Sequence, residues 1–183
     1  MYWSGNDYDK MAMLVVDIYV DYNIRSFPVD EKDICRKLGL KLIPYSEYPE
    51  EQQVLLFKRS RDAFFAPATK TTPPTVFYND KVESYGRLRY NIFHEVKHFV
   101  NVDKDDGEYN DNMADYFARY FMCPIPYLIE NGISDEMTLI SDHLVSQQAA
   151  YNTMKNVRNR KAVYGDIIFD YEKPLVDLFA IHF

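Results

Sequence analysis

The order in which apolar patterns follow one another restricts the folds open to this chain. Apolar residues recur at helical spacing over Asp9–Asn23 and Asp30–Leu38. Three short apolar runs bounded by turn residues then predict strands at Lys41–Tyr45, Val54–Lys58 and Thr75–Tyr78. Helices, then a small three-stranded sheet, then further helices is the order of an α+β protein, because an α/β protein would alternate strands and helices.

Four segments after the predicted sheet return to helical spacing: Arg87–Asn101, Asp111–Met122, Asp135–Leu144 and Ser146–Asn159. Pro124 and Pro126 are expected to end the second of these helices. The tail, Val163–Phe183, is interpreted as one or two strands or an extended packing arm. We therefore expect a core over residues 1–126, with residues 127–183 forming a helical appendage and a C-terminal tail packed on it.

Charge and cysteine content exclude several classes of protein. The 183 residues carry a formal net charge of −7, which argues against a nucleic-acid binder because such a protein needs a basic face. Cys35 and Cys123 are the only cysteines and lie far apart, which fits a reducing compartment. The longest apolar run, Met11–Val16, is too short to span a bilayer. The expected location is the cytoplasm, with no membrane partner.

The stretch His94-Glu95-Val96-Lys97-His98 contains the residues that predict a metal site. Residues four apart on a helix are offset by about 40° and about 6 Å, so His94 and His98 can face one metal ion. Glu95, turned by about 100°, can accept a proton from a water on that metal. Chance matches to this pattern occur on ordinary amphipathic helices. Two of the four histidines in the chain fall within the motif, which favours the functional interpretation.

A catalytic zinc site needs a third protein ligand and one open position. Asp111 is our prediction, because it shares a helix face with the expected core positions Ala114 and Ala118, and a buried acid needs a partner. The alternative is that Asp111 is only a helix N-cap. Asp115, one turn later, is assigned to the second shell as the hydrogen-bond partner of His94. Glu108 is the reserve ligand.

The chain resembles the ImmA/IrrE family of bacterial metallo-endopeptidases over about residues 10–160. The resemblance rests on Tyr78-Asn79-Asp80, on Arg87 through His98, and on the helix that begins Asp111-Asn112-Met113-Ala114-Asp115-Tyr116-Phe117-Ala118. The match continues with Met122-Cys123-Pro124 and includes Phe27-Pro28-Val29-Asp30, Leu38-Gly39-Leu40 and the helical segment Leu144–Ala150. Three positions depart from the family pattern: Phe93, Lys97 and Asp111 stand where a small residue, a small residue and Glu are usual.

The resemblance implies a small zincin-like (gluzincin-type) domain whose short sheet packs on helices that include the His-Glu-x-x-His helix. It further implies a cytoplasmic zinc endopeptidase that cleaves a helix-turn-helix repressor of a mobile element or stress regulon. Manganese or iron could take the place of zinc, since two His and one carboxylate suit several divalent ions. In related zinc peptidases the strand before the zinc helix pairs with the substrate backbone, which would assign Val76, Phe77 and Tyr78 to a substrate-binding edge. The alternative is an interior strand.

Two other functions remain open from the sequence. The departures at Lys97 and Asp111 motivate a non-catalytic anti-repressor, which would bind a repressor without cutting it. Direct DNA binding through Ser146–Lys161 is a weaker hypothesis, because the acidic balance of the chain argues against it. No residue is assigned to oxyanion stabilisation, for which the candidates are Arg89, Tyr120, His143 and Tyr151.

Overall fold

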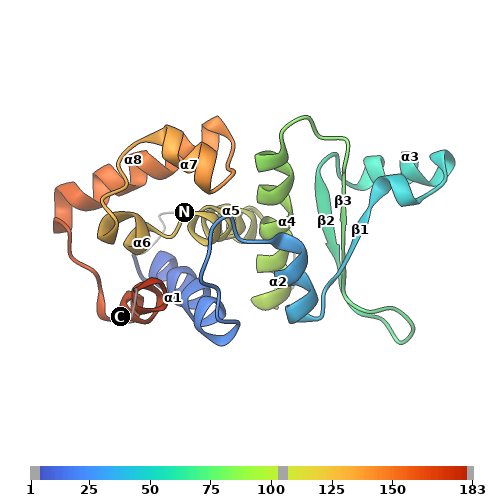
Figure 1. Ribbon diagram of the computed structural model, residues 1–183. Coiled ribbons are helices and arrows are strands. Elements are labelled where there is room, and N and C mark those ends of the chain that lie inside the picture. Colours follow the sequence, from blue (N-terminus) through green and yellow to red (C-terminus); the bar gives the residue numbers. More distant parts are fainter. Residues whose placement is uncertain (1–4, 103–106, 181–183) are drawn as a thin grey trace. The chain divides into compact units, whose positions relative to one another are not determined.

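The computed structural model describes residues 5–102 and 107–180, and these form an α+β protein with one small mixed sheet (Figure 1). The expected α+β class with one small three-stranded sheet is therefore confirmed. The elements of the first half are α1 (Gly5–Asp21), α2 (Glu31–Leu38), β1 (Lys41–Pro44), η1 (Tyr45–Glu47), α3 (Glu50–Arg59), β2 (Ala63–Ala66) and β3 (Thr75–Tyr78). The elements of the second half are α4 (Tyr85–Val100), α5 (Glu108–Met122), α6 (Ile125–Glu130), α7 (Glu136–Asp142), α8 (Gln147–Tyr164), η2 (Asp170–Glu172) and α9 (Lys173–Phe179).

The chain divides into two compact units. One combines Met1–Val29 with Arg119–Phe183, and the other is the continuous segment Asp30–Ala118. The division falls within α5 and differs from the expected boundary at residue 126, which stays a prediction about domains. We call the units the terminal unit and the central unit, and describe each by itself.

The central unit holds the whole sheet, in the order β1-β3-β2. β1 pairs with β3 in parallel, with Leu42 opposite Val76, and β2 pairs with β3 antiparallel, with Phe65 opposite Val76. The helices α2 and α4 lie on one side of this sheet, where α4 contacts β2 and β3 (Figure 1). β3 is thus the central strand.

Local sequence explains the helix ends of the central unit. Asp30 caps α2 by accepting hydrogen bonds from two backbone N–H groups, and Gly39 ends the helix with φ 76°, a left-handed conformation that glycine adopts without strain. Ser84 caps α4 by accepting one hydrogen bond, from the Arg87 N–H. The apolar residues Ile92, Phe93 and Val96 recur along α4 and are buried, as the spacing predicted.

The predicted strand at Val54–Lys58 is wrong. These residues belong to α3, which follows Pro49 and carries acidic residues in its first turn and basic residues in its last. Both charge preferences stabilise a helix through its dipole. No residue of α3 is buried, and the helix packs on η1, so the run Val54-Leu55-Leu56-Phe57 lacks the burial that usually accompanies such a pattern. The third strand is instead β2, which the sequence did not predict.

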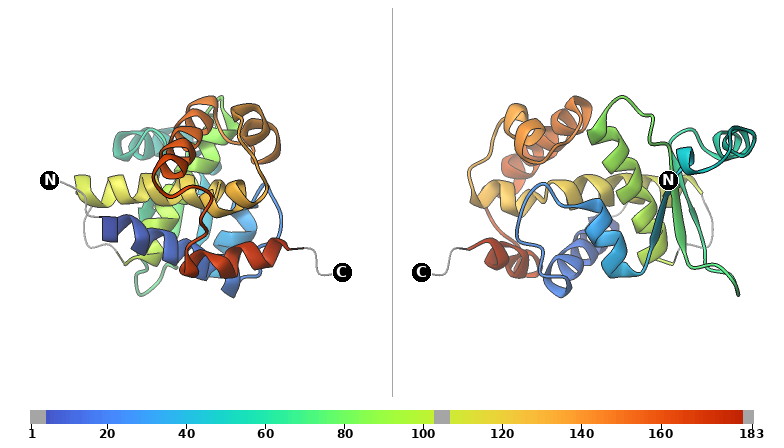
Figure 2. Two further views of the ribbon diagram at one scale, coloured as in Figure 1. Left: turned by 90° about the vertical axis from the view of Figure 1, so that its left-hand side faces the viewer. Right: turned by 45° about the vertical axis from the view of Figure 1, so that its right-hand side comes forward.

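The terminal unit is helical. α1 packs beside α9, and α6 contacts both α8 and α9 (Figure 2). The Tyr19 hydroxyl donates to the Phe121 carbonyl at 2.6 Å, which joins α1 to the end of α5. Buried Glu172 accepts hydrogen bonds from Arg160 and Tyr120 and from the Phe169 N–H.

The expected strands or extended arm at Val163–Phe183 are also wrong for the described part of that tail. It contains the end of α8, η2 and α9. Lys173-Pro174 begins α9, where proline is tolerated because the first N–H groups of a helix have no partner within it. Within residues 5–102 and 107–180, no helix is both long and apolar enough to cross a membrane.

Candidate metal centre

Helix α4 brings the two motif histidines together in the central unit. His94 and His98 are one turn apart, and their ring centroids are 5.1 Å apart. The His98 side chain is 6% exposed and that of His94 is 19% exposed. The helix therefore places two imidazoles on the same face, as the spacing predicted.

Asp111 from α5 completes a group of three donors. Its Oδ1 lies 3.7 Å from Nε2 of His98 and 4.0 Å from Nε2 of His94. One donor atom from each residue lies within 4.8 Å of the others, so the group could hold a metal ion. Tetrahedral ligands about 2.0–2.1 Å from zinc are separated by about 3.3 Å. Because the donors lie within 4.8 Å of one another, they need to approach by at most about 1.5 Å to meet this geometry, which side-chain rotation can supply.

The structure argues against the N-cap role considered for Asp111. α5 begins at Glu108, and the Asp111 N–H donates to the Gly107 carbonyl at 3.1 Å, so Asp111 lies inside the first turn and is not the N-cap. Its side chain is 52% exposed, so the expectation that burial would demand a partner is wrong. Glu108 is exposed. The proximity of Asp111 to both imidazoles, and not its burial, supports it as a ligand.

Asp115 lies one turn after Asp111 and contacts His94 on the other ring nitrogen. Nδ1 of His94 and Oδ1 of Asp115 are 2.9 Å apart, so Asp115 makes the hydrogen bond to His94 that the sequence predicted. Burial opposes protonation of His94, but this hydrogen bond and three nearby carboxylates favour it, so the pKa of His94 is raised above its ordinary value. Donation from Nδ1–H to Asp115 leaves Nε2 as the acceptor atom, on the side of Asp111.

Glu95 lies in the same cleft as these donors. The cleft has a volume of about 260 Å³, and it is lined by Arg59, Ser60, Ala63, Phe64, Phe65, His94, Glu95, His98 and Asp111. Oε2 of Glu95 accepts a hydrogen bond from the Phe65 N–H at 2.9 Å. A backbone group of β2 therefore holds the carboxylate beside the two imidazoles.

The strand at this cleft is β2, and the predicted edge role of Val76, Phe77 and Tyr78 is wrong. These residues form β3, which has a neighbour on each side. The Asn79 N–H donates to the Asp62 carbonyl, so these two residues are a hydrogen-bonded pair of the β2–β3 ladder. Hydrogen-bonded and non-hydrogen-bonded pairs alternate along an antiparallel ladder, so the pair Phe65 and Val76, three positions further on, is not hydrogen-bonded. Phe65 therefore directs its N–H and C=O away from β3. The alternative of an interior strand for Val76–Tyr78 is correct.

Sequence reasoning missed the contribution of Ala63-Phe64-Phe65-Ala66. This run is short and apolar and lies between Ser60-Arg61-Asp62 and Pro67, a pattern typical of a strand. Its proximity to Glu95 is a tertiary contact between residues 30 apart in sequence, which no local pattern contains.

Two of the three departures from the family pattern are buried, and the third, Asp111, is half exposed. Phe93 and Lys97 are both 0% exposed. Nζ of Lys97 donates to the Asn110 carbonyl at 3.1 Å, so this lysine links α4 to the turn of α5 that carries Asp111. A small residue at position 97 could not make that link.

Three of the four oxyanion candidates make other contacts, and the fourth is exposed. Buried Arg89 pairs with Glu31. In the terminal unit, the Tyr120 hydroxyl donates to Glu172 and Nδ1 of His143 contacts the Met122 carbonyl at 2.9 Å. Tyr151 is 53% exposed. Oxyanion stabilisation stays unassigned.

A scan against models of protein families finds no match to this chain, and a search of curated proteins finds no significant match.

Proposed function

We propose that this protein is a metal-dependent peptidase, with His94, His98 and Asp111 as metal ligands and Glu95 as the general base. The observation that carries the proposal is the convergence of two imidazoles and one carboxylate from α4 and α5, with a second carboxylate in the same cleft. The resemblance to ImmA/IrrE metallo-endopeptidases, on motifs that include these four residues, also supports it. Zinc is the expected metal, with manganese and iron as alternatives.

The residues divide the work of peptide hydrolysis among them. Zinc, when bound, would supply Lewis-acid chemistry that lowers the pKa of a water and polarises the scissile carbonyl. Asp115 holds the His94 ring in the tautomer whose Nε2 can be a ligand. Glu95 accepts a proton from the attacking water and returns it to the leaving amine. The Phe65 N–H fixes the Glu95 carboxylate before reaction.

The substrate we propose is an extended segment of a helix-turn-helix repressor, as the family resemblance implies. β2 is the strand available for pairing with it, because β2 lies at the edge of the sheet and lines the cleft. A substrate strand added to β2 would place its backbone beside Glu95 and the histidines.

Incubation of the zinc-loaded protein with the repressor encoded beside its gene tests this function, with fragments identified by mass spectrometry. We expect cleavage by the unaltered protein and by Glu108→Gln, which changes an exposed acid of α5. Glu95→Gln should bind zinc normally but cleave about 10²–10⁴-fold more slowly. Purified protein that takes up no stoichiometric divalent metal would refute the proposal.

The anti-repressor alternative predicts a different result in the same assay. In that case Glu95→Gln would release the repressor from its DNA as well as the unaltered protein does, and no fragments would form. The DNA-binding alternative has less support. Three basic residues of α8 are already paired with acids: Arg158 with Glu136, Arg160 with Glu172, and Lys161 with Asp166.

A further inference from the structure

A second concave surface lies at the other edge of the sheet. It is a groove of about 660 Å³ between α2 and β1, whereas the candidate metal centre lies at β2. We define this α2–β1 groove by its lining residues, which are Lys32, Cys35, Arg36, Gly39, Leu40, Lys41, Leu42, Pro44, Glu47, Pro73 and Tyr78. The proposed peptidase mechanism uses none of them.

The groove contains unpaired strand backbone. The Lys41 N–H donates to the Pro74 carbonyl at 3.0 Å, so Lys41 faces β3. Successive residues of a strand direct their N–H and C=O groups to opposite edges, so those of Leu42 point away from β3. Among the described residues, no strand covers this edge, because β1 is the last in the order. An extended chain could pair with Leu42 here.

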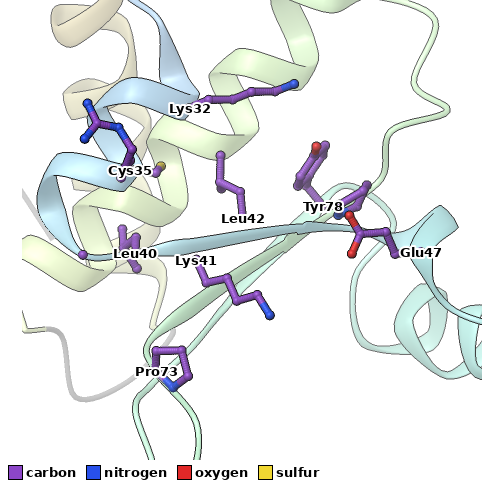
Figure 3. A pocket seen from close by; sticks show the side chains of 11 residues that line it. Lys32, Cys35, Leu40, Lys41, Leu42, Glu47, Pro73 and Tyr78 are labelled. Carbon is purple, nitrogen blue, oxygen red and sulfur yellow. The ribbon is translucent and has the colours of Figure 1, made fainter.

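The side chains around this backbone are cationic and apolar. Lys32 and Leu42 lie on the α2 side of β1, and Lys41 leaves the strand on the opposite side (Figure 3). Arg36 pairs with Asp33, but neither Lys32 nor Lys41 forms an ion pair within residues 5–102 and 107–180. Three cations therefore line the groove against one acid, in a chain whose net charge is −7.

We infer that the α2–β1 groove binds an extended, acidic segment of a partner protein, which adds to the sheet beside β1. The Leu42 N–H and C=O would supply main-chain hydrogen bonds, while Lys32 and Lys41 would meet carboxylates on the two faces of the added strand. Side chains of a strand alternate between its faces, so acids at several positions could reach cations on both sides. The cations alone would also suit the phosphates of a nucleic acid. The open edge of β1 beside them favours an acidic protein segment, because only a protein backbone can add to the sheet as a strand.

Fluorescence anisotropy with a labelled heptapeptide that alternates glutamate and valine tests the inference. We expect saturable binding that is about tenfold weaker for the double variant Lys32→Glu, Lys41→Glu. The control pair Lys58→Glu, Lys70→Glu changes the same charge at exposed sites outside the groove, and should bind within about twofold of the unaltered protein. A peptide methylated on alternate amide nitrogens should also bind about tenfold more weakly.

Hydrogen exchange gives a second measurement that charge alone does not change. We expect the Leu42 amide to become protected when the peptide binds, because only a paired strand covers that N–H. Equal binding of the methylated peptide, or no protection at Leu42, would overturn strand addition. Tighter binding of a single-stranded oligonucleotide than of the peptide would overturn the choice of partner. Zinc loading and the Glu95→Gln variant should leave all these results unchanged, which separates this inference from the proposed peptidase function.

Discussion

Replacement of Asp115 by Asn tests whether Asp115 orients His94 in the candidate metal centre. Asp115 accepts from Nδ1 of His94 at 2.9 Å, and this leaves Nε2 on the side of Asp111. An asparagine could donate its amide N–H to Nδ1, which would put the ring hydrogen on Nε2 and remove that nitrogen as a ligand. If its oxygen accepts instead, the tautomer survives but the negative charge that raises ligand basicity is lost.

Both outcomes weaken metal binding, and the expected size follows from the contact. Loss of a carboxylate that orients a ligating histidine typically costs about 10–100-fold in metal affinity, or about 1.4–2.7 kcal/mol. Because the contact between Asp115 and His94 is direct and short, we expect the loss of metal affinity to fall within this range. His98 and Asp111 keep their own positions, so binding should weaken without being abolished.

Competition of the protein with a zinc chelator of known affinity measures this effect. Glu108→Gln is the matched control, because it removes one negative charge from the first turn of the same helix at an exposed position. Its zinc affinity should change by less than about threefold. If Asp115→Asn loses no more zinc affinity than Glu108→Gln, then the hydrogen bond from His94 to Asp115 does not orient His94 for metal binding.

Three further predictions concern stability and pH. Arg89→Met should lower the free energy of unfolding by about 3–5 kcal/mol in urea titrations, because it leaves Glu31 buried without its cation. The control Arg87→Met removes an ion pair whose arginine is 58% exposed, and should lower the free energy of unfolding by less than about 1 kcal/mol. Lys97→Met should cost about 1–3 kcal/mol in the same assay, because a carbonyl at the start of α5 loses its donor; an unchanged midpoint would contradict that role. Because the pKa of His94 is raised in the folded protein, protonation of His94 stabilises the metal-free fold at pH below 6.5. This stabilisation is lost as the pH rises through the pKa that His94 has in the folded protein. Zinc needs the neutral ring, so its affinity should fall about tenfold per pH unit below that pKa, and a pH-independent affinity in chelator titrations would exclude His94 as a ligand.

Much of the candidate metal centre follows from the sequence, because its main geometry is local. The four-residue spacing of His94 and His98 determines that both imidazoles share a face once the segment is helical. The apolar spacing predicts α4 itself, and the core positions Ala114 and Ala118 of α5 are buried as expected. Asp111 does lie near both histidines, but the burial from which we predicted it is absent, since burial in a folded protein depends on neighbours that spacing does not reveal.

Only the tertiary structure decided what lies beside these helices. The apolar run Val54–Phe57 is compatible with either a strand or a helix, and strand pairing, which would have selected the strand, is a non-local interaction. The same holds for Ala63–Ala66: its pairing with β3 makes β3 central and places the Phe65 N–H against Glu95. Helical contacts join residues three or four apart, so the spacing of residues along the chain predicts them. The order and edges of a sheet depend on contacts between residues far apart in sequence, which that spacing does not contain.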